Sequence, residues 1–458
     1  MLRTLHDFKH VFFIGVAGTG MSALAQYLNG VGKIVAGSDR YFSKGEAGEI
    51  REKLEKEGIQ CFAQDGTGIT AETELVVVST AVEDTVPEVQ KAKSLNIPII
   101  KRSDLLAMIS DSKKTIAVGG TSGKSTTSAM IFDILQHAGL EPSIISGAGL
   151  TSIIKEGRIG NAKVGKGDWL VIEADESDGS IVQYHAEIGL LLNIDKDHKE
   201  IDVLMDIFST FRNNSKLFVV NRAHPLAASL STDVGNDFIY DKDEVAGFVA
   251  TDFSQDGLAI RFSVNGVPFV LHSVGKHNME NALAAAAVAA LTGVDLKTSA
   301  EAIAHYEGIY RRHQVIGEKN GVILIDDYAH NPVKCAASIR ACQPIADKLI
   351  AWFQPHGYAP TKFLRKDFCE EISAAMRPGD EIWMSEIFYA GGTTTKDISA
   401  ADLINDLKEK GVDAHFVEHR DQLVAALRPH FTGKTVLLLM GARDPSLEQF
   451  ASQVWNQL

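Results

Sequence analysis

The stretch from Thr115 to Met130 carries the strongest chemical pattern in the chain. An apolar run leads into Gly119-Gly120-Thr121-Ser122-Gly123-Lys124-Ser125-Thr126-Thr127, and good helix formers follow. A strand, a glycine loop and a helix in this order let backbone N–H groups and a helix N-terminus surround phosphate oxygens. Lys124 adds a mobile cation, and the Ser125 hydroxyl is placed to reach a phosphate-bound Mg²⁺. We therefore predict a nucleotide phosphate site. The match is to GKS and its context, because the general P-loop pattern has a further glycine where this chain has Val118.

Two more predicted strands end in side chains that could complete this site. The run Trp169–Ile172 leads into Glu173-Ala174-Asp175-Glu176-Ser177-Asp178-Gly179, and the run Ile188–Ile194 leads into Asp195-Lys196-Asp197-His198. In a parallel sheet these ends face the crevice that the glycine loop also faces. Clustered carboxylates repel one another unless a cation joins them. We expect Glu173 and His198 to approach one metal ion, and a solvated acidic loop is the alternative.

A second glycine loop lies near the start of the chain. Val11–Ile14 is predicted to be a buried strand, and Gly15-Val16-Ala17-Gly18-Thr19-Gly20-Met21-Ser22 opens a helix. The next predicted strand ends in Gly37-Ser38-Asp39. An acidic residue about 20 positions after a glycine loop is typical of Rossmann-like units, where it contacts a ribose. The spacing here is G-x-x-G-x-G, so a nucleotide site and a tight turn that only packs a helix on a strand both remain open.

The second half of the chain places further polar residues at the ends of predicted elements. These segments are the start of an alanine-rich helix at 275–281, the Arg311-Arg312 pair, the strand end at 326–332, and the loops at 355–358 and 391–395. Residues of these types can contact ligands, but they also serve as caps, linkers and solvated loops. Their position beside predicted strands makes them candidates, not assignments.

Composition limits the class of protein. The chain has 458 residues, of which 45% are hydrophobic and 23% charged, which is typical of a soluble protein with two to four domains. The net charge of −14 argues against a nucleic-acid partner. The four cysteines, at 61, 335, 342 and 369, lack metal-binding spacing, so we expect buried, reduced thiols. With no apolar run of 18 residues and no signal-peptide pattern, the sequence predicts a cytoplasmic protein that stays off the membrane.

Alternating strand and helix patterns predict an α/β fold with three domains. We expect the domains to span residues 1–112, 113–312 and 313–458, with a polar run at 110–114 as the first linker. The first is predicted to be Rossmann-like, and the third is predicted to be another α/β unit. The central domain is predicted to have a parallel sheet with a small antiparallel edge, because a period-2 hairpin surrounds Asn265-Gly266.

Taken in order, the motifs resemble those of the Mur ligase family of peptidoglycan synthesis over the whole chain. They are GVAGTGMS, GSD, GGTSGKSTT, EADESDGS, NIDKDH, GKHNMENALAA, RRHQ and DDYAHNP. With the FQPH stretch, they are most similar to the alanine-adding members. The resemblance implies a Rossmann-like UDP-binding domain, a central ATP-binding domain and a C-terminal Rossmann-like domain that binds the incoming amino acid. It also implies an ATP-dependent, ADP-forming ligase that joins the carboxylate of UDP-N-acetylmuramate to an amine, L-alanine first, through an acyl phosphate.

The same resemblance implies roles for individual residues. For the UDP-sugar it implies Gly15, Gly18, Gly20, Met21, Ser38 and Asp39. For ATP it implies Gly120, Thr121, Ser122, Gly123, Lys124, Ser125 and Thr126 at the phosphates, Arg312 at the γ-phosphate, His277 and Asn281 near adenine, and Asp327 at the ribose. For Mg²⁺ it implies Ser125, Glu173 and His198, and for the amino acid it implies His330. His356 is a further expected substrate-binding residue. The implied catalytic set is Lys124, Glu173, His198, Arg312 and His330.

Two departures from the family pattern bear on the acceptor. The alanine-adding members usually carry GTHGKTT and PHRYTRT, where this chain has GTSGKSTT and PHGYAPT. Gly357 and Pro360 thus replace two arginines suited to a carboxylate, and Lys362 or Arg365 could substitute for them. A recycling-type ligase that uses a preformed peptide, a paralogue that uses another amine and a non-catalytic nucleotide-binding protein are the alternatives. The expected partners are UDP-N-acetylmuramate and an amino acid or peptide, with the chain as a monomer or homodimer.

Overall fold

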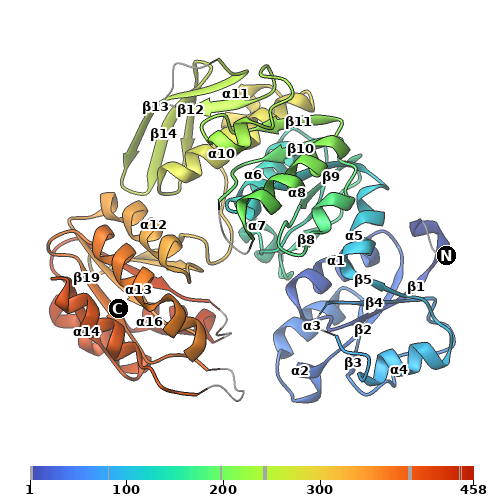
Figure 1. Ribbon diagram of the computed structural model, residues 1–458, viewed down its shortest axis with the longest axis horizontal. Coiled ribbons are helices and arrows are strands. Elements are labelled where there is room, and N and C mark those ends of the chain that lie inside the picture. The colour runs from blue at the N-terminus through green and yellow to red at the C-terminus, as the bar shows by residue number, and fades with distance from the viewer. Residues whose placement is uncertain are drawn as a thin grey trace. The chain divides into compact units, whose positions relative to one another are not determined.

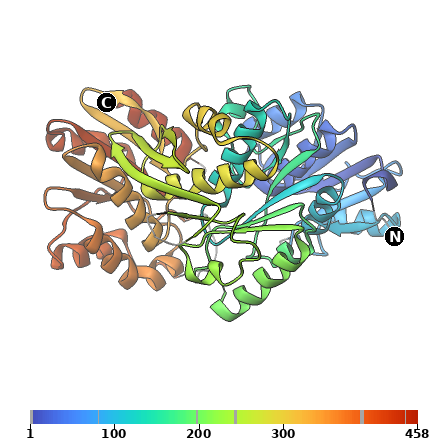
Figure 2. The ribbon, with the colours of Figure 1, turned by 90° about the horizontal axis from the view of Figure 1, so that it is seen from above.

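The computed structural model describes residues 4–80, 82–195, 199–240, 245–389, 395–442, 444 and 446–458. The chain forms two compact units. Unit 1 comprises residues 1–253, 261–271 and 277–309, and unit 2 comprises residues 254–260, 272–276 and 310–458. Unit 1 runs from blue to yellow in Figures 1 and 2, and most of unit 2 is orange and red. Unit 1 contains two lobes with separate sheets, and the predicted borders after residues 112 and 312 stay predictions.

The first lobe has a five-stranded parallel sheet in the order β3-β2-β1-β4-β5. Its strands are β1 (His10–Ile14), β2 (Ile34–Asp39), β3 (Gln60–Ala63), β4 (Leu75–Val78) and β5 (Ile99–Lys101). Its helices are α1 (Thr19–Gly30), α2 (Arg40–Ser43), α3 (Gly48–Lys56), α4 (Pro87–Ser94) and α5 (Arg102–Ser110). The strand order reverses beside β1, so the first glycine loop lies at the switch point where ligands bind in such sheets.

The central lobe has a six-stranded sheet in the order β11-β10-β6-β9-β7-β8. Its strands are β6 (Lys114–Gly119), β7 (Ser143–Ile145), β8 (Ala162–Lys163), β9 (Trp169–Glu173), β10 (Ile188–Leu191) and β11 (Leu217–Val220). Its helices are α6 (Lys124–His137), α7 (Thr151–Ile154), α8 (Ile201–Asn214) and α9 (Pro225–Ala228). All pairs are parallel except β7 with β8. β6 therefore stands between β9 and β10, the two strands whose polar ends were predicted to meet the glycine loop.

The hairpin around Asn265-Gly266 is confirmed, but it belongs to a sheet of its own instead of an edge of the parallel sheet. That sheet has the order β12-β13-β14-β15. Its strands are β12 (Phe238–Tyr240), β13 (Phe248–Asp256), β14 (Ala259–Val264) and β15 (Val267–Leu271), and α10 (Lys276–Leu291) and α11 (Leu296–Ala304) follow. Asn265 and Gly266 have φ angles of 48° and 81°, the positive pair that a tight two-residue hairpin requires.

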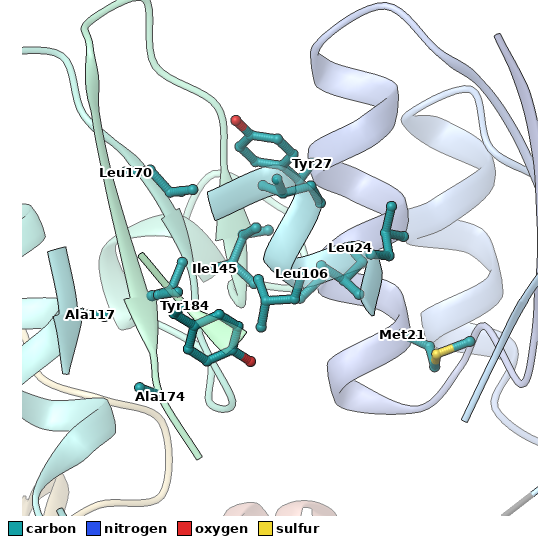
Figure 3. Close-up of a cluster of buried hydrophobic side chains, with 14 of the residues drawn as sticks. Met21, Leu24, Tyr27, Leu106, Ala117, Ile145, Leu170, Ala174 and Tyr184 are labelled. Carbon is teal, nitrogen blue, oxygen red and sulfur yellow. The ribbon is translucent and has the colours of Figure 1, made fainter. Parts of the chain in front are cut away.

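The two lobes of unit 1 share one hydrophobic core. Figure 3 shows side chains of α1 and α5 in the first lobe beside side chains of β7 and β9 in the central lobe, including Leu106 and Ile145. Tyr27 and Tyr184 are also part of this cluster, and both are almost completely buried. Each Å² of apolar surface that this contact removes from water stabilises the packing of the two lobes by about 25 cal/mol. The lobes are therefore held together by the hydrophobic effect and not only by the linker.

A buried polar network also joins these lobes. Gln26 Nε2 donates to Asn161 Oδ1 at 2.7 Å. Asn161 Nδ2 in turn donates to the Thr19 carbonyl at 2.8 Å and to Ser22 Oγ at 3.0 Å. Gln26 and Asn161 are each 1% exposed. Because buried amides must find partners, this network fixes the orientation of α1 against the segment before β8.

Unit 2 has a six-stranded sheet in the order β16-β17-β21-β18-β19-β20. Its strands are β16 (Gln314–Lys319), β17 (Val322–Asp327), β18 (Lys348–Phe353), β19 (Glu381–Met384), β20 (Asp413–Phe416) and β21 (Thr435–Met440). Its helices are α12 (Pro332–Cys342), α13 (Tyr358–Ala375), α14 (Ala400–Glu409), α15 (Leu423–Leu427) and α16 (Leu447–Gln457). Only β16 runs antiparallel among the described pairs.

Alternate residues of β17 and β18 pack into two different cores. Ile323 and Ala351 belong to one cluster, whereas Leu324 and Trp352 belong to the other. Since successive strand residues point to opposite faces, both faces of this sheet are covered. The strands are consequently apolar throughout, which is why their sequence shows runs and not alternation.

The cysteine prediction is confirmed, since all four thiols are free and buried. Burial raises the pKa of the Cys61 thiol to about 12 and that of Cys369 to about 11. Within the described ranges, no helix is both long and apolar enough to span a membrane.

Candidate active site

The glycine loop predicted to bind phosphate joins β6 to α6. Gly120 and Gly123 have φ angles of 136° and 83°, which residues with a side chain rarely adopt. A Cβ atom on Gly123 would also lie 2.7 Å from Oδ1 of Asn281. Gly123 occupies the N-cap position of α6 and has no side chain to cap it. The first N–H groups of α6, including that of Thr126, are therefore suited to an anion.

Lys124 is held at the start of α6 by a carbonyl and a carboxylate. Its Nζ donates to the Gly120 carbonyl at 2.7 Å and to Glu176 Oε2 at 2.8 Å. The two paired side chains are 16% and 6% exposed. These partners take two of the three ammonium donors, and a phosphate oxygen can take the third. Burial would raise the pKa of nearby Asp175, but the Ser177 backbone N–H and the charge of Lys124 hold it below its usual value.

Glu173, at the end of β9, accepts three hydrogen bonds. Ser146 Oγ and the Gly147 N–H donate to Oε1, both at 2.7 Å, and Ser125 Oγ donates to Oε2 at 3.0 Å. A carboxylate beside a hydroxyl offers the oxygen ligands that Mg²⁺ prefers. The donor set thus fits the predicted magnesium site. His198, the other predicted ligand, lies outside the described residues.

A second polar chain supports the loop from the side of β10. Thr121 Oγ1 donates to Asn193 Oδ1 at 2.9 Å, and Asn193 Oδ1 also accepts from the Ser122 N–H at 2.9 Å. Asp195 lies 3.3 Å from Thr121 Oγ1 and 3.2 Å from His224 Nε2. The hydrogen bond with His224 lowers the pKa of Asp195. We did not single out Asn193 or His224 from the sequence, although each follows the end of a parallel strand, which was the available signal.

The start of α10 lies against the first turns of α6. Asn281 is 7% exposed, its Oδ1 accepts from Thr127 Oγ1 at 3.2 Å, and its Nδ2 donates to Asn278 Oδ1 at 3.3 Å. His277 is exposed one residue into α10. Asn281 therefore lies beside the glycine loop, where its Oδ1 is close to Gly123. The predicted contacts of His277 and Asn281 with adenine stay predictions.

The glycine loop of the first lobe is tied to the end of β2. The N–H groups of Gly15 and Val16 donate to the Ser38 carbonyl at 2.8 and 3.0 Å. Asp39 Oδ2 accepts from the Ala17 N–H and Oδ1 from the Tyr41 N–H, both at 3.0 Å. Asp39 thus shapes the loop and caps α2 at once, and it is 4% exposed.

The remaining predicted contacts of the UDP-sugar differ in their surroundings. Gly18 is the N-cap residue of α1. A Cβ atom on Gly20 would come within 3.1 Å of the Arg102 side chain. The Met21 side chain is buried in the core that Figure 3 shows. Of this predicted set, Met21 therefore contributes packing in the structure, and its contact with a substrate stays a prediction.

In unit 2, Arg311 and Arg312 have different surroundings. Arg311 is 5% exposed and pairs with Asp326 at 2.8 Å. Arg312 is exposed, and its guanidinium lies 5.3 Å from the centre of the Tyr328 ring. A buried paired arginine serves the fold, whereas an exposed one beside an aromatic ring can turn to a ligand.

Asp327, His330 and His356 lie at the carboxyl ends of β17 and β18. Ser338 Oγ donates to Asp327 at 2.7 Å, and His313 Nε2 lies 3.7 Å from it. Burial alone would raise the pKa of Asp327, but His313, Ser338 and Arg312 together hold it below its usual value. The ring centres of His330 and His356 are 5.9 Å apart. The structure thus brings together His330, predicted near the amino acid, and His356, predicted to bind a substrate.

The two cations suggested as substitutes for the missing arginines already have acidic partners. Lys362 Nζ lies 2.5 Å from Asp397, and Arg365 binds Asp406 through two hydrogen bonds of 2.6 and 2.8 Å. Gly357, the N-cap residue of α13, has a φ of 71°, and a Cβ atom there would lie 3.2 Å from Pro360. An arginine at position 357 would be strained in this loop. An amino-acid carboxylate bound by Lys362 or Arg365 would have to compete with an aspartate.

Comparisons with known proteins cover nearly the whole chain. Three family models match consecutive segments: "Mur ligase family, catalytic domain" over residues 10–114, "Mur ligase middle domain" over 118–289, and "Mur ligase, glutamate ligase domain" over 311–443. These matches confirm the resemblance seen in the motifs.

Individual relatives agree with the family models. A protein named UDP-N-acetylmuramate–L-alanine ligase from Caldanaerobacter subterraneus is 34% identical, and the alignment covers 96% of each chain. A protein of the same name from Myxococcus xanthus is 32% identical over 97% of this chain and 94% of its own. The crystal structure of a UDP-N-acetylmuramate-alanine ligase from Thermotoga maritima has a TM-score of 0.80 at 26% identity, over 98% of both chains. The chain belongs to the Mur ligase family.

Proposed function

We propose that this protein is an ATP-dependent ligase that joins the carboxylate of UDP-N-acetylmuramate to the amine of L-alanine, with ADP and phosphate as the other products. The observation that carries the proposal is that Lys124 pairs with Glu176 and Ser125 bonds to Glu173 at the carboxyl edge of the central sheet. The relatives named for this reaction match the chain over nearly its full length. We also propose that the protein works in the cytoplasm, as a monomer or a homodimer.

The reaction needs an anionic carboxylate to approach an anionic phosphate. Lys124 and the first N–H groups of α6 would hold the β- and γ-phosphates and offset this repulsion. A carboxylate oxygen of the sugar then attacks the γ-phosphorus, the bond to ADP breaks, and an acyl phosphate forms. The amine attacks the acyl carbon, loses a proton, and phosphate leaves. Positioning and charge neutralisation supply most of the acceleration in such transfers.

Mg²⁺ would be held by Glu173 and Ser125, together with His198, and when bound it would neutralise phosphate charge. The three donors on Glu173 keep this carboxylate in one orientation before any ligand arrives. We propose that Arg312 reaches the γ-phosphate, that Asp327 contacts the ribose, and that His277 and Asn281 contact the adenine. The exposure of Arg312, in contrast to the burial of Arg311, supports its part of this assignment.

For the first lobe we propose a UDP-sugar site on the loop of Gly15, Gly18 and Gly20, with Ser38 and Asp39 at its rim. Asp39 fixes the loop through the Ala17 N–H, so it would shape the site even where it does not touch the ligand. His330 and His356 would lie by the incoming amine in unit 2. A neutral imidazole there could accept the proton that the amine releases.

Gly357 and Pro360 stand where the alanine-adding members usually carry two arginines suited to a carboxylate. A recycling-type ligase that takes a preformed peptide is therefore the second candidate. The pairing of Lys362 and Arg365 with aspartates favours the peptide-using ligase. A peptide can make contacts along its whole length, so its binding depends less on a cation at its carboxylate than the binding of L-alanine does.

The test is phosphate release from ATP with UDP-N-acetylmuramate and a panel of amines: L-alanine, glycine, L-serine, and a tripeptide that begins with L-alanine. We expect L-alanine to give the highest kcat/KM, and Arg312→Ala to lower kcat with each acceptor. A higher kcat/KM with the tripeptide would mean that the acceptor is a peptide and not L-alanine, and the ligase activity itself would stand. Binding of ATP without turnover of any amine would instead favour the non-catalytic alternative.

A further inference from the structure

Metal-ligating side chains gather at the amino edge of the unit 2 sheet, at the opposite ends of the strands from Asp327 and His356. Glu381 begins β19, and Asp413 and His415 lie on β20, which pairs with β19 in the register Glu381 to Asp413. His430 ends a short 3₁₀ helix (Arg428–His430) before β21. The parallel pairing therefore brings residues from distant parts of the chain to one point.

The distances suit a small cation. His430 Nδ1 lies 2.9 Å and His415 Nε2 3.9 Å from Glu381 Oε2, and one ligand atom from each residue lies within 4.8 Å of the others. Asp413 Oδ1 is 2.7 Å from His415 Nε2. A tetrahedral site with bonds of about 2.0–2.1 Å places its ligands about 3.3 Å apart. The observed separations bracket that value.

The carboxylate and both rings are already oriented by neighbours. Lys348 Nζ donates to Glu381 Oε1 at 2.6 Å, and Trp383 Nε1 donates to Oε2 at 2.9 Å. The Trp383 ring stacks on His415 at 4.4 Å between centres and meets His430 edge-on at 5.0 Å. Glu381 is 3% exposed. The carboxylate and the rings are thus preorganised, as metal sites with a second layer of hydrogen bonds are.

One atom of the cluster lacks the bond that burial demands. His415 Nε2 has almost no exposed surface, yet it makes no hydrogen bond of acceptable geometry with any residue that the structure describes. Asp413 Oδ1 is near enough but is not placed to accept from the ring. A buried imidazole nitrogen beside two carboxylates is satisfied by a cation that all three share.

We propose that Glu381, His415 and His430, with Asp413 as a fourth ligand, bind one transition-metal dication, with Zn²⁺ as the best match. Two imidazoles with carboxylates suit Zn²⁺ and its neighbours in the first row, whereas Mg²⁺ and Ca²⁺ take oxygen ligands. The metal would join β19, β20 and the segment before β21, so its role is to stabilise unit 2. The inference does not depend on the proposed reaction.

The experiment uses the untagged full-length protein, stripped with a chelator and kept in excess Mg²⁺ so that the phosphate site does not take the added metal. Zn²⁺ binding is measured by calorimetry, and Co²⁺ is added separately because its visible spectrum reports tetrahedral coordination by nitrogen and oxygen. We expect one Zn²⁺ per chain, an intense Co²⁺ spectrum, and a rise in the unfolding temperature with Zn²⁺.

The variant His415→Ala/His430→Ala should lower the affinity for Zn²⁺ by more than about 100-fold, since even indirect partners of a metal cost about 10- to 100-fold. The matched control is His137→Ala/His305→Ala. These two histidines also stack, at 6.4 Å, beside one carboxylate, Glu301, but on the surface of unit 1. The control should bind Zn²⁺ as the wild type does.

If the cluster variant is unfolded without metal, His415→Gln tests the same ligand with a smaller change in packing. Wild-type protein that binds no Zn²⁺, an octahedral Co²⁺ spectrum, or equal affinity of the wild type and the His415 variants overturns the proposal. Loss of binding in the His137 and His305 control alone overturns it as well. In those cases the cluster is a network of ion pairs around Glu381.

Discussion

Replacing Lys124 by alanine should remove ATP turnover and also destabilise unit 1. The ammonium group pairs with Glu176, whose side chain is 6% exposed, so the substitution leaves a carboxylate buried without its partner. Breaking a buried ion pair on one side costs about 3–5 kcal/mol. The 16% exposure of Lys124 places the expected loss near the lower end, at about 3 kcal/mol. The loss of a cation at the transferred phosphate should slow turnover by about 10³-fold or more.

A second substitution separates the two effects. Glu176→Gln in the Lys124→Ala background removes the buried charge and should recover most of the stability, but none of the ATP turnover. Lys163→Ala serves as the control, because Lys163 pairs with an exposed glutamate, and such pairs contribute about 0.2–1 kcal/mol. Calorimetric unfolding and phosphate release are measured on each variant. A stable single variant would refute the buried pair, and turnover by the double variant would refute the phosphate role.

Three further predictions concern other parts of the chain. Asp39→Ala should weaken binding of UDP-N-acetylmuramate but not of ATP, because Asp39 holds the glycine loop of the first lobe; titration calorimetry that finds an equal loss for both ligands would contradict separate sites. Arg311→Ala should destabilise unit 2 by about 3–5 kcal/mol, whereas Arg312→Ala should slow phosphate release at a smaller loss of stability, because Arg312 only helps to lower the pKa of Asp327; urea unfolding with the opposite ranking would reverse the two roles. The pKa of Asp133 is raised to about 7, first by burial and then by the charge of Glu307, so the folded state keeps a proton that the unfolded chain releases above about pH 4. Wild-type stability should therefore fall between about pH 4 and pH 7. Asp133→Asn should abolish that slope and raise the free energy of unfolding by about 2 kcal/mol at pH 8. This is half of the free energy that the whole pKa shift represents, because Asp133 keeps some exposed surface. Parallel pH profiles of the two proteins would show that Asp133 is ionised throughout.

Local patterns in the sequence identified the chemistry that is local in the structure. Gly120, Gly123 and Lys124 are close in sequence, and strand, loop and helix signals surround them, so the phosphate loop could be predicted. The prediction that Glu173 lies beside this loop needed one more rule, that the carboxyl ends of parallel strands meet at one edge of the sheet. The partners that fix these groups are far away in sequence. Glu176 lies 52 positions after Lys124, and nothing in a single sequence states which carboxylate a lysine meets.

The same distinction explains what local patterns in the sequence did not show. The turn at Asn265-Gly266 is a local signal and was found, but the sheet to which the hairpin belongs depends on long-range pairing. Met21 follows a glycine loop, which suggested a ligand contact that stays a prediction; that its side chain packs in a core depends on neighbours far away in sequence. His224 is an isolated histidine in the sequence, and only the fold brings it to Asp195.

The shared core and the Asn161 network have a consequence for how the chain can be divided. Asn161 both donates and accepts across the contact between lobes, so a displacement of about 1 Å would break several buried hydrogen bonds together. A fragment cut at residue 112 would expose Met21, Leu24 and Tyr27 to water and remove the hydrogen bond of Gln26 to Asn161. Such a fragment would expose an apolar surface, and its self-association would compete with its folding. We therefore expect the smallest part of this half of the protein that folds by itself to be all of unit 1, which carries both glycine loops.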